Sequence, residues 1–264
     1  MIKSLRTSLA ALALLSAAPA FAASRPWPPR QPWPPNDLSR PQPPRMPVVA
    51  ALLKVPPPPD AVVLYDGRGL GQWNLAADPR SGWHQFRGRM LPGGKAFNWL
   101  FSKRSFGSVQ VHLEFREPEP ARGNGQERGN SGVRLMGVYE IQILDADHNK
   151  TYADGLPGAV YGQTPPIVVP VMRRGQWQSL DILFDAPRFQ GKRLVRPPYV
   201  TVLLDGVAVQ DHQVIFGNTS AHKVPLGYLT RTDRGPVGLQ DHGEPSSIVA
   251  FRNVWVRPLH PQGR

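Results

Sequence analysis

The sequence Val109-Gln-Val-His-Leu-Glu-Phe115 alternates apolar and polar residues without a break. Alternation at every second residue predicts a β-strand that buries one face and exposes the other. The buried face is expected to carry Val109 and every second residue up to Phe115, and the exposed face Gln110, His112 and Glu114. This stretch therefore predicts a sheet with a core on one side and water on the other.

Five further short segments are rich in β-branched or aromatic residues and are bounded by Gly, Pro, Asn or Asp, which is typical of strands. They are residues 61–65, 139–144, 180–184, 199–204 and 248–256. Asp205-Gly206, directly after the fourth segment, predicts a hairpin turn. No stretch of ten or more residues beyond residue 22 shows a helical period. The pattern predicts an all-β sandwich of antiparallel sheets over residues 61–264.

The composition excludes several classes of protein. The chain has 264 residues, enough for one large domain or two small ones. It contains no cysteine, which rules out disulfide scaffolds, thiolate metal sites, cysteine nucleophiles and the lipobox of bacterial lipoproteins. Its 41% of hydrophobic residues is enough to bury a core, so the chain as a whole is not expected to be disordered.

Residues 1–22 have the features of a secretory signal peptide. Lys3 and Arg6 precede a short apolar run, and Ala20-Phe21-Ala22 supplies the small residues that a signal peptidase cleaves after. The alternative is an anchor that is never cleaved, but these flanks favour cleavage. We therefore expect a periplasmic or secreted protein.

Residues 23–60 form a proline-rich segment. The sequence Pro-Trp-Pro-Pro occurs twice in it, with Trp27 and Trp33 at equivalent positions. Because proline cannot donate backbone hydrogen bonds, the segment is expected to be extended or disordered. It could be a spacer that holds the domain away from another body, or a docking ligand for an envelope partner. We favour the spacer.

Most of the formal net charge of +12 lies beyond residue 60. No nucleic-acid recognition motif accompanies it, and an exported protein rarely meets nucleic acid, so no nucleic-acid partner is expected. Ordinary surface charge explains the balance. The sharper alternative is attraction to an anionic envelope surface or to anionic glycans.

Three polar side chains stand out on the segment that follows Tyr139. Its apolar face carries Tyr139 and the two isoleucines, whereas Glu140 and Gln142 share the opposite face and Asp145 ends the strand. An ordinary solvated face would explain this pattern. A curved sandwich that collects ligand-binding polar groups on a concave face would also explain it.

Two loops carry further candidate residues. Residues 239–243 bring together Gln240, Asp241 and His242 beside a glycine, and residues 155–166 carry Tyr161 and Gln163 between glycines and prolines. Stiff loops commonly position functional side chains. A carboxylate next to a histidine is also common as a simple turn-capping pair.

These stretches, with several others in the same order, resemble the 3-keto-disaccharide hydrolase family over about residues 62–259. The motifs are LYDGRGLGQW (64–73), GNSGVRLMG (129–137), YEIQILD (139–145), GAVYGQ followed by Pro165-Pro166 (158–163), GQW (175–177), LQDHG (239–243) and FRNVW (251–255). The resemblance implies a concanavalin-like jelly roll of two curved antiparallel sheets. Arg134, Met136 and Val169 depart from the family's usual residues, which affects the expected substrate more than the chemistry.

The resemblance also implies a reaction. When C3 of a sugar is a ketone, its C2 proton is acidic, so a base can remove it, the C1–O bond can break by elimination, and water can add to the resulting enone. We expect Glu140 to be the base and His242 the acid or electrophile, with Asp241 orienting the histidine. The expected substrate-binding residues are Arg134, Gln142, Asp145, Tyr161, Gln163 and Gln240.

The resemblance also bears on a cofactor and on a partner enzyme. A divalent metal held by Glu140, Asp145 or His242 would be chemically reasonable, although no spacing establishes one. A separate sugar 3-oxidoreductase would have to supply the keto sugar.

Two other functions stay open because a fold does not carry its chemistry with it. One is a non-catalytic glycan-binding module, which would need amides and aromatic residues but no base. The other is an envelope scaffold acting through the proline-rich segment. The cluster of Glu140, Gln142, Asp241 and His242 favours the enzyme.

Overall fold

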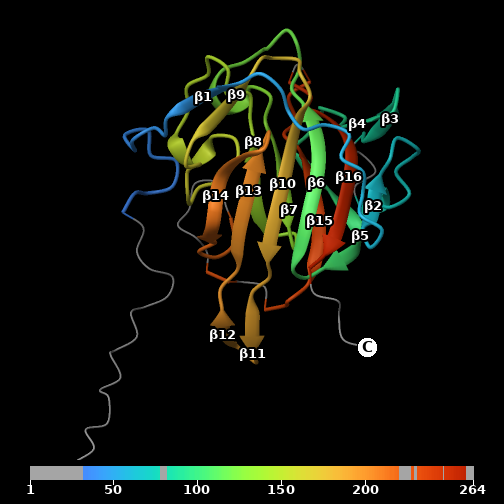
Figure 1. Cartoon of the computed structure of the whole chain (residues 1–264), viewed down its shortest axis with the longest axis vertical. Coiled ribbons are helices and arrows are strands. Elements are labelled where there is room, and N and C mark those ends of the chain that lie inside the picture. Colours follow the sequence, from blue (N-terminus) through green and yellow to red (C-terminus); the bar gives the residue numbers. More distant parts are fainter. Residues whose placement is uncertain (1–31, 78–81, 220–226, 229–230, 246, 260–264) are drawn as a thin grey trace, which may run out of the picture.

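A computed structural model describes residues 32–77, 82–219, 227–228, 231–245 and 247–259. Two β-sheets lie face to face, with the larger sheet in front of the smaller one in Figure 1. The described residues contain three single-turn 3-10 helices, so the predicted all-β class is confirmed. These helices are η1 (Leu75–Ala77), η2 (Gly125–Glu127) and η3 (Ala153–Gly155).

The larger sheet has eight strands in the spatial order β14-β13-β10-β6-β16-β4-β3, and β2 also pairs with β16. All of its pairings are antiparallel. Its strands are β2 (Val62–Tyr65), β3 (His84–Phe86), β4 (Arg89–Leu91), β6 (Val109–Arg116), β10 (Gln178–Asp185), β13 (Tyr199–Leu204), β14 (Val207–Val214) and β16 (Ala250–Pro258).

The smaller sheet has four antiparallel strands in the order β5-β15-β7-β8. Two small pairs flank the sandwich: β1 with β9, which is parallel, and the hairpin β11-β12. The strands are β5 (Asn98–Phe106), β7 (Ser131–Leu135), β8 (Tyr139–Ile143), β15 (Gly235–Asp241), β1 (Arg45–Val48), β9 (Val169–Met172), β11 (Arg188–Gln190) and β12 (Arg193–Arg196).

The core lies between the two sheets. The apolar face predicted for β6 is buried there, with Val111, Leu113 and Phe115 fully enclosed. From the smaller sheet, Ile141 and Leu239 belong to the same apolar cluster. The alternating patterns of β6 and β8 therefore place one face of each strand in the core, as predicted.

The hairpin predicted at Asp205-Gly206 is confirmed. Leu204 pairs with Val207 across the turn, and both turn residues have positive φ, 52° at Asp205 and 79° at Gly206. This conformation suits the right-handed twist of two adjacent antiparallel strands.

The predicted wet face of β6 is wrong at two of its three positions. His112 and Glu114 are both 0% exposed. The ring of Trp255 stacks on His112, with 5.0 Å between the ring centroids, and residues 52–55, here called the strap, lie over Glu114. The strap's Lys54 N–H donates to Glu114 Oε1 at 2.5 Å. Its Val55 carbonyl accepts from Asn253 Nδ2 at 3.0 Å and from the indole of Trp255 at 3.3 Å. The N-terminal segment thus covers what would otherwise be an open sheet face.

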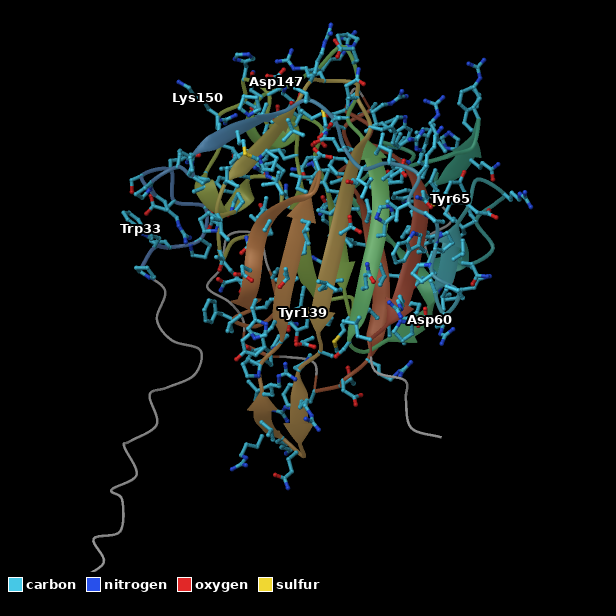
Figure 2. The ribbon with its side chains drawn as sticks, in the orientation of Figure 1. Trp33, Asp60, Tyr65, Tyr139, Asp147 and Lys150 are labelled. Carbon is cyan, nitrogen blue, oxygen red and sulfur yellow. The ribbon has the colours of Figure 1, made fainter. Side chains whose placement is uncertain are left out.

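In the described part of the proline-rich segment, residues 32–40 are mostly bends and turns and residues 45–48 form a strand, and the segment packs on its own domain instead of standing away from it. Figure 2 shows Trp33 and Asp60 on opposite sides of the molecule, so the segment crosses the sandwich. Its β1 pairs with β9, and the Asn36 N–H donates to Asp154 at 3.0 Å. Trp27 and the predicted signal peptide lie outside the described residues. No described helix is long and apolar enough to cross a membrane.

Candidate active site

The candidate site lies on the face of the smaller sheet that points away from the core. Alternation along β8 sends Glu140 and Gln142 to this face, because their neighbours Tyr139 and Ile141 occupy the core. The register with β7 places Arg134 opposite Glu140 and Gly132 opposite Gln142. β15 adds Gln240 to the same face.

Glu140 is the centre of this group. It is 4% exposed, and its two carboxylate oxygens have different partners. Oε1 accepts from Gln240 Nε2 at 3.1 Å, and Oε2 from Arg134 Nη2 at 3.3 Å. The side chain lies against Gly132, where an added Cβ would come within 2.8 Å of Oε1. Glycine at that position therefore leaves the space that the carboxylate occupies.

Burial raises the pKa of the Glu140 carboxyl above its ordinary value. The charge and hydrogen bond of Arg134, the hydrogen bond of Gln240 and the charge of His242 act in the opposite direction without cancelling the effect. A carboxyl group with a raised pKa is a stronger base when ionised, which suits proton abstraction near neutral pH.

Two buried amides face the site with acceptor atoms that lack partners. The Gln142 amide nitrogen donates to Asn130 Oδ1 at 3.0 Å and to Gln126 Oε1 at 3.1 Å. Within the described part of the chain, Gln142 Oε1 and Gln240 Oε1 accept no hydrogen bond although both are buried. Since buried polar atoms are normally paired, these two oxygens are suited to receive hydroxyl donors from a bound sugar.

An aromatic wall closes one side of the site. The guanidinium of Arg134 lies over the ring of Trp99, 4.0 Å from its centroid. Phe97, which is 60% exposed, lies edge-to-face against both Trp99 and His242. Arrangements of this kind bind the apolar faces of sugar rings while amides read the hydroxyl groups.

Tyr161 lies beside the site, as expected, with an unexpected partner. Its hydroxyl contacts the hydroxyl of Tyr152 at 2.5 Å, and its backbone N–H donates to the Glu140 carbonyl at 3.1 Å. Burial raises the pKa of Tyr161, and the charge of Glu140 raises it further. The pair of phenols therefore stays protonated and can donate hydrogen bonds at neutral pH.

The predicted role of Asp241 is wrong. Its Oδ2 accepts from the Gly94 N–H at 2.9 Å and from the Asn98 amide at 3.3 Å, and its Oδ1 accepts from the Gly243 N–H at 2.9 Å. His242 instead contacts Glu244 through Nδ1, at 2.6 Å from Oε2. Glu244 is therefore the orienting carboxylate, and Asp241 fixes the loop around residues 94–98.

Two other predicted substrate-binding residues lie elsewhere. Asp145 accepts from Arg128 Nε at 2.8 Å, with Arg174 at 3.7 Å, in an ionic cluster beyond the end of β8. Gln163 is 2% exposed and uses both ends of its amide to hold the backbone at Phe216 and Gly217. Both residues are structural, because their polar atoms are directed to these partners and not to Glu140.

The predicted metal ligands do not come together, because Asp145 belongs to the ionic cluster and not to the site. Among the residues that the structure describes, no group of three or more histidine or acidic side chains could hold a metal ion.

Six residues of the site are not predicted from the sequence. Asn130 lies inside the motif GNSGVRLMG, and Glu244 stands two residues after His242, so spacing indicates both. The alternation of Trp99 with the buried Leu100 on β5 is a strand signal that indicates the orientation of Trp99. The residues are Phe97, Trp99, Gln126, Asn130, Tyr152 and Glu244.

Comparisons with known proteins identify the family and the fold. Residues 60–257 match the family described as a 3-keto-alpha-glucoside-1,2-lyase-like domain. A crystal structure of a candidate glycosyl hydrolase from Parabacteroides distasonis ATCC 8503 is 36% identical, with 76% of this chain and 84% of that chain covered and a TM-score of 0.71. No curated protein matches the chain.

Two more candidate glycosyl hydrolases from the same organism share the fold. They are 19% and 18% identical, with TM-scores of 0.55 and 0.53, and the match covers 75% and 76% of this chain and 99% and 94% of theirs. Fold and site together define a carbohydrate-active jelly-roll protein. More narrowly, the chain belongs to the 3-keto-disaccharide hydrolase family.

Proposed function

We propose that this protein is an exported enzyme that cleaves the glycosidic bond of 3-keto-glycosides or 3-keto-disaccharides. The observation that carries the proposal is Glu140, a buried carboxylate with a raised pKa between two amides whose acceptor oxygens lack partners. A lectin would use the amides, but it has no need of a buried base.

In the proposed reaction, Glu140 removes the C2 proton of the keto sugar. The electron pair left on C2 forms an enolate with the C3 ketone, and the charge that develops on the ketone oxygen is stabilised by the Arg134 guanidinium. Collapse of the enolate forms the C1–C2 double bond and breaks the C1–O bond, while His242 protonates the leaving oxygen. Water then adds at C1, and C2 regains a proton.

The substrate must be made by another enzyme. The C3 ketone requires a prior two-electron oxidation of the sugar, so a separate sugar 3-oxidoreductase would act before this protein. Export through the N-terminal signal peptide would place the reaction in the periplasm or outside the cell. An envelope partner that binds residues 23–60 stays a prediction.

The test is Glu140→Gln, assayed with a 3-keto-glucoside and an unoxidised glucoside, with and without chelator. The amide keeps the size of the side chain but cannot accept the proton, so cleavage of the keto sugar should fall by about 10²-fold or more. Binding of the keto sugar should be retained. Glu119→Gln, an exposed glutamate outside the site, is the matched control and should keep full activity.

The aromatic wall of Trp99 and Phe97 favours a second candidate, a non-catalytic glycan-binding module. If wild-type protein binds both sugars and cleaves neither, the glycan-binding function stands. If wild-type protein cleaves the unoxidised glucoside, the reaction is ordinary glycoside hydrolysis and the keto mechanism is wrong.

A further inference from the structure

A cavity of about 710 Å³ opens at one end of the sandwich, away from the candidate active site. It lies between the turn that joins β5 to β6, the chain around Pro187 and the chain at residues 233–234. The hairpin β11-β12 extends beyond this end of the larger sheet (Figure 1). A volume of this size is in the range of small-molecule and oligosaccharide sites.

The charged lining of this cavity is strongly basic. Four arginines line it and only one acidic residue, Asp233, does so; the arginines are Arg104, Arg188, Arg196 and Arg234. The hairpin adds Lys192 and Arg193, and residues 186–198 contain no aspartate or glutamate. Such a concentration of guanidinium groups attracts anions and matches carboxylate or phosphate oxygens in pairs.

The hairpin register brings two of these charges together. Arg188 stands directly opposite Arg196 in the β11-β12 pairing. Like charges opposite each other on two strands destabilise the pair. Asp185 contacts Arg196 at 2.7 Å and offsets part of this repulsion, whereas Arg188 is exposed. An anion bound between Arg188 and Arg196 would offset the remaining repulsion between their charges.

The remainder of the lining is apolar. Phe106, Ala186, Pro187 and Pro258 supply this surface, and the Arg104 guanidinium lies 5.5 Å from the centroid of the Phe106 ring. Apolar atoms beside cationic groups fit a sugar ring that carries a negative charge, since the ring's C–H face can contact them. A bare inorganic anion would leave these apolar atoms uncovered.

We propose that this cavity binds an anionic oligosaccharide, one whose sugars carry carboxylate or phosphate groups. The site is separate from the candidate active site. Trp99 lies in the candidate active site, and Arg104 lines the cavity. Both residues belong to β5, and the five residues of extended strand between their positions span about 16 Å. The proposal goes beyond the cleavage reaction, because binding here would hold the enzyme on an acidic glycan whichever bond it cleaves.

Calorimetric titration of the full chain tests the proposal. The ligands are trigalacturonate, glucose 6-phosphate and neutral maltotriose. At least one anionic sugar should bind, with an affinity that weakens as salt increases, and maltotriose should not bind at this cavity. Trigalacturonate binding assigns the charge to carboxylates, and glucose 6-phosphate binding assigns it to phosphate.

The variants locate the binding. The double variant Arg104→Gln/Arg188→Gln should weaken anionic sugar binding at least about tenfold, because charge-assisted hydrogen bonds are lost. Arg68→Gln/Arg122→Gln removes the same number of exposed charges elsewhere and should bind like wild type. Glu140→Gln should also bind like wild type, which separates this result from any failure of the cleavage reaction.

Three results would overturn the proposal. They are equal binding of the neutral sugar at the cavity, equal weakening in the control double variant, and no binding of either anionic sugar.

Discussion

Three buried carboxylates, Glu140, Asp145 and Asp241, differ in the partners that surround them. Asp145 is paired with arginine, and Asp241 accepts three hydrogen bonds from neighbouring loops. Glu140 has one arginine contact at the longer distance of 3.3 Å and one amide donor. The partners of Asp145 and Asp241 are structural, whereas Glu140 lies beside buried amide oxygens without partners, so of these three carboxylates Glu140 best fits the proposed base.

Arg134→Gln should shift the pH dependence of the reaction. The Arg134 charge lowers the pKa of Glu140, although burial keeps that pKa above its ordinary value. Without the charge, the pKa rises further and Glu140 is protonated at a higher pH. The acid limb of kcat/KM, measured on the keto sugar, should therefore move to higher pH. An unmoved acid limb would show that Glu140 is not the titrating base.

Asp241→Ala should lower the stability of the protein, whereas Glu244→Gln should lower its rate. Asp241→Ala leaves the Gly94 N–H and the Asn98 amide without their acceptor. This loss costs about 1–3 kcal/mol of stability and should lower Tm by several degrees. The Glu244 change releases only His242, so Tm should stay close to wild type while kcat falls. Thermal melts and initial rates check both. If Glu244→Gln melts early and Asp241→Ala does not, the two roles are reversed.

At the scale of the strands, the β7-β8 pair builds the site. Each strand sends alternate residues into the core, and the register brings Arg134 to Glu140 and Gly132 to Gln142. Gly132 has no side chain, so the carboxylate of Glu140 folds over the β7 backbone. The position of Glu140 thus depends on strand pairing and not on a loop.

Gly132→Ala should remove activity while the protein stays folded. The added Cβ would come within 2.8 Å of Glu140 Oε1 and 3.1 Å of its Cγ, so the carboxylate must move. A displaced base loses the proton-transfer geometry, and the rate should fall at least about tenfold. Gly71→Ala is the control, because nothing lies within 4 Å of its added Cβ. Equal rates in the two variants would mean that the position of Glu140 does not matter.

Alternation predicted the strands and the orientation of Glu140 and Gln142 correctly, because a sheet forces adjacent residues to opposite faces. The same rule explains the error at Asp241. Gln240 points out of β15 and Asp241 points inward, so Asp241 cannot orient a histidine that follows it. Burial of His112 by a segment far away in sequence depends on tertiary packing, which a local pattern does not report.

At the scale of the whole molecule, the N-terminal segment is part of the domain. The strap and β1 pack against strands that lie inside the family's range, residues 60–257. The strap covers Glu114 on the larger sheet, and the candidate site lies on the outer face of the smaller sheet, on the other side of the core. The two outer faces of the sandwich therefore differ: the N-terminal segment packs on one, and the candidate site lies on the other.

Glu114→Gln should make stability less sensitive to acid. Burial acts to raise the pKa of the Glu114 carboxyl, but hydrogen bonds from Asn253, Arg252 and Lys54 hold it below its ordinary value. The folded state therefore keeps Glu114 ionised at a pH where the unfolded chain has taken up a proton. This stabilisation is full above the ordinary pKa and is lost as pH falls through the lowered one.

Thermal melts of wild type and Glu114→Gln between pH 7 and pH 3 measure this effect. The wild type should melt higher at pH 7, and the difference between the two Tm values should shrink towards pH 3. A difference that stays constant across this range would mean that the ionisation of Glu114 does not contribute to holding the strap.

The contacts of the strap also bear on the order of folding. The strap's Val55 accepts a hydrogen bond from Trp255, which lies 200 residues later in the chain. During synthesis the N-terminal residues emerge first, yet their partners on β16 emerge nearly last. The bonds from Asn253 and Trp255 to the Val55 carbonyl can therefore form only after β16 has been made. A segment near the start of the described chain is thus held in place by contacts from a strand near its end.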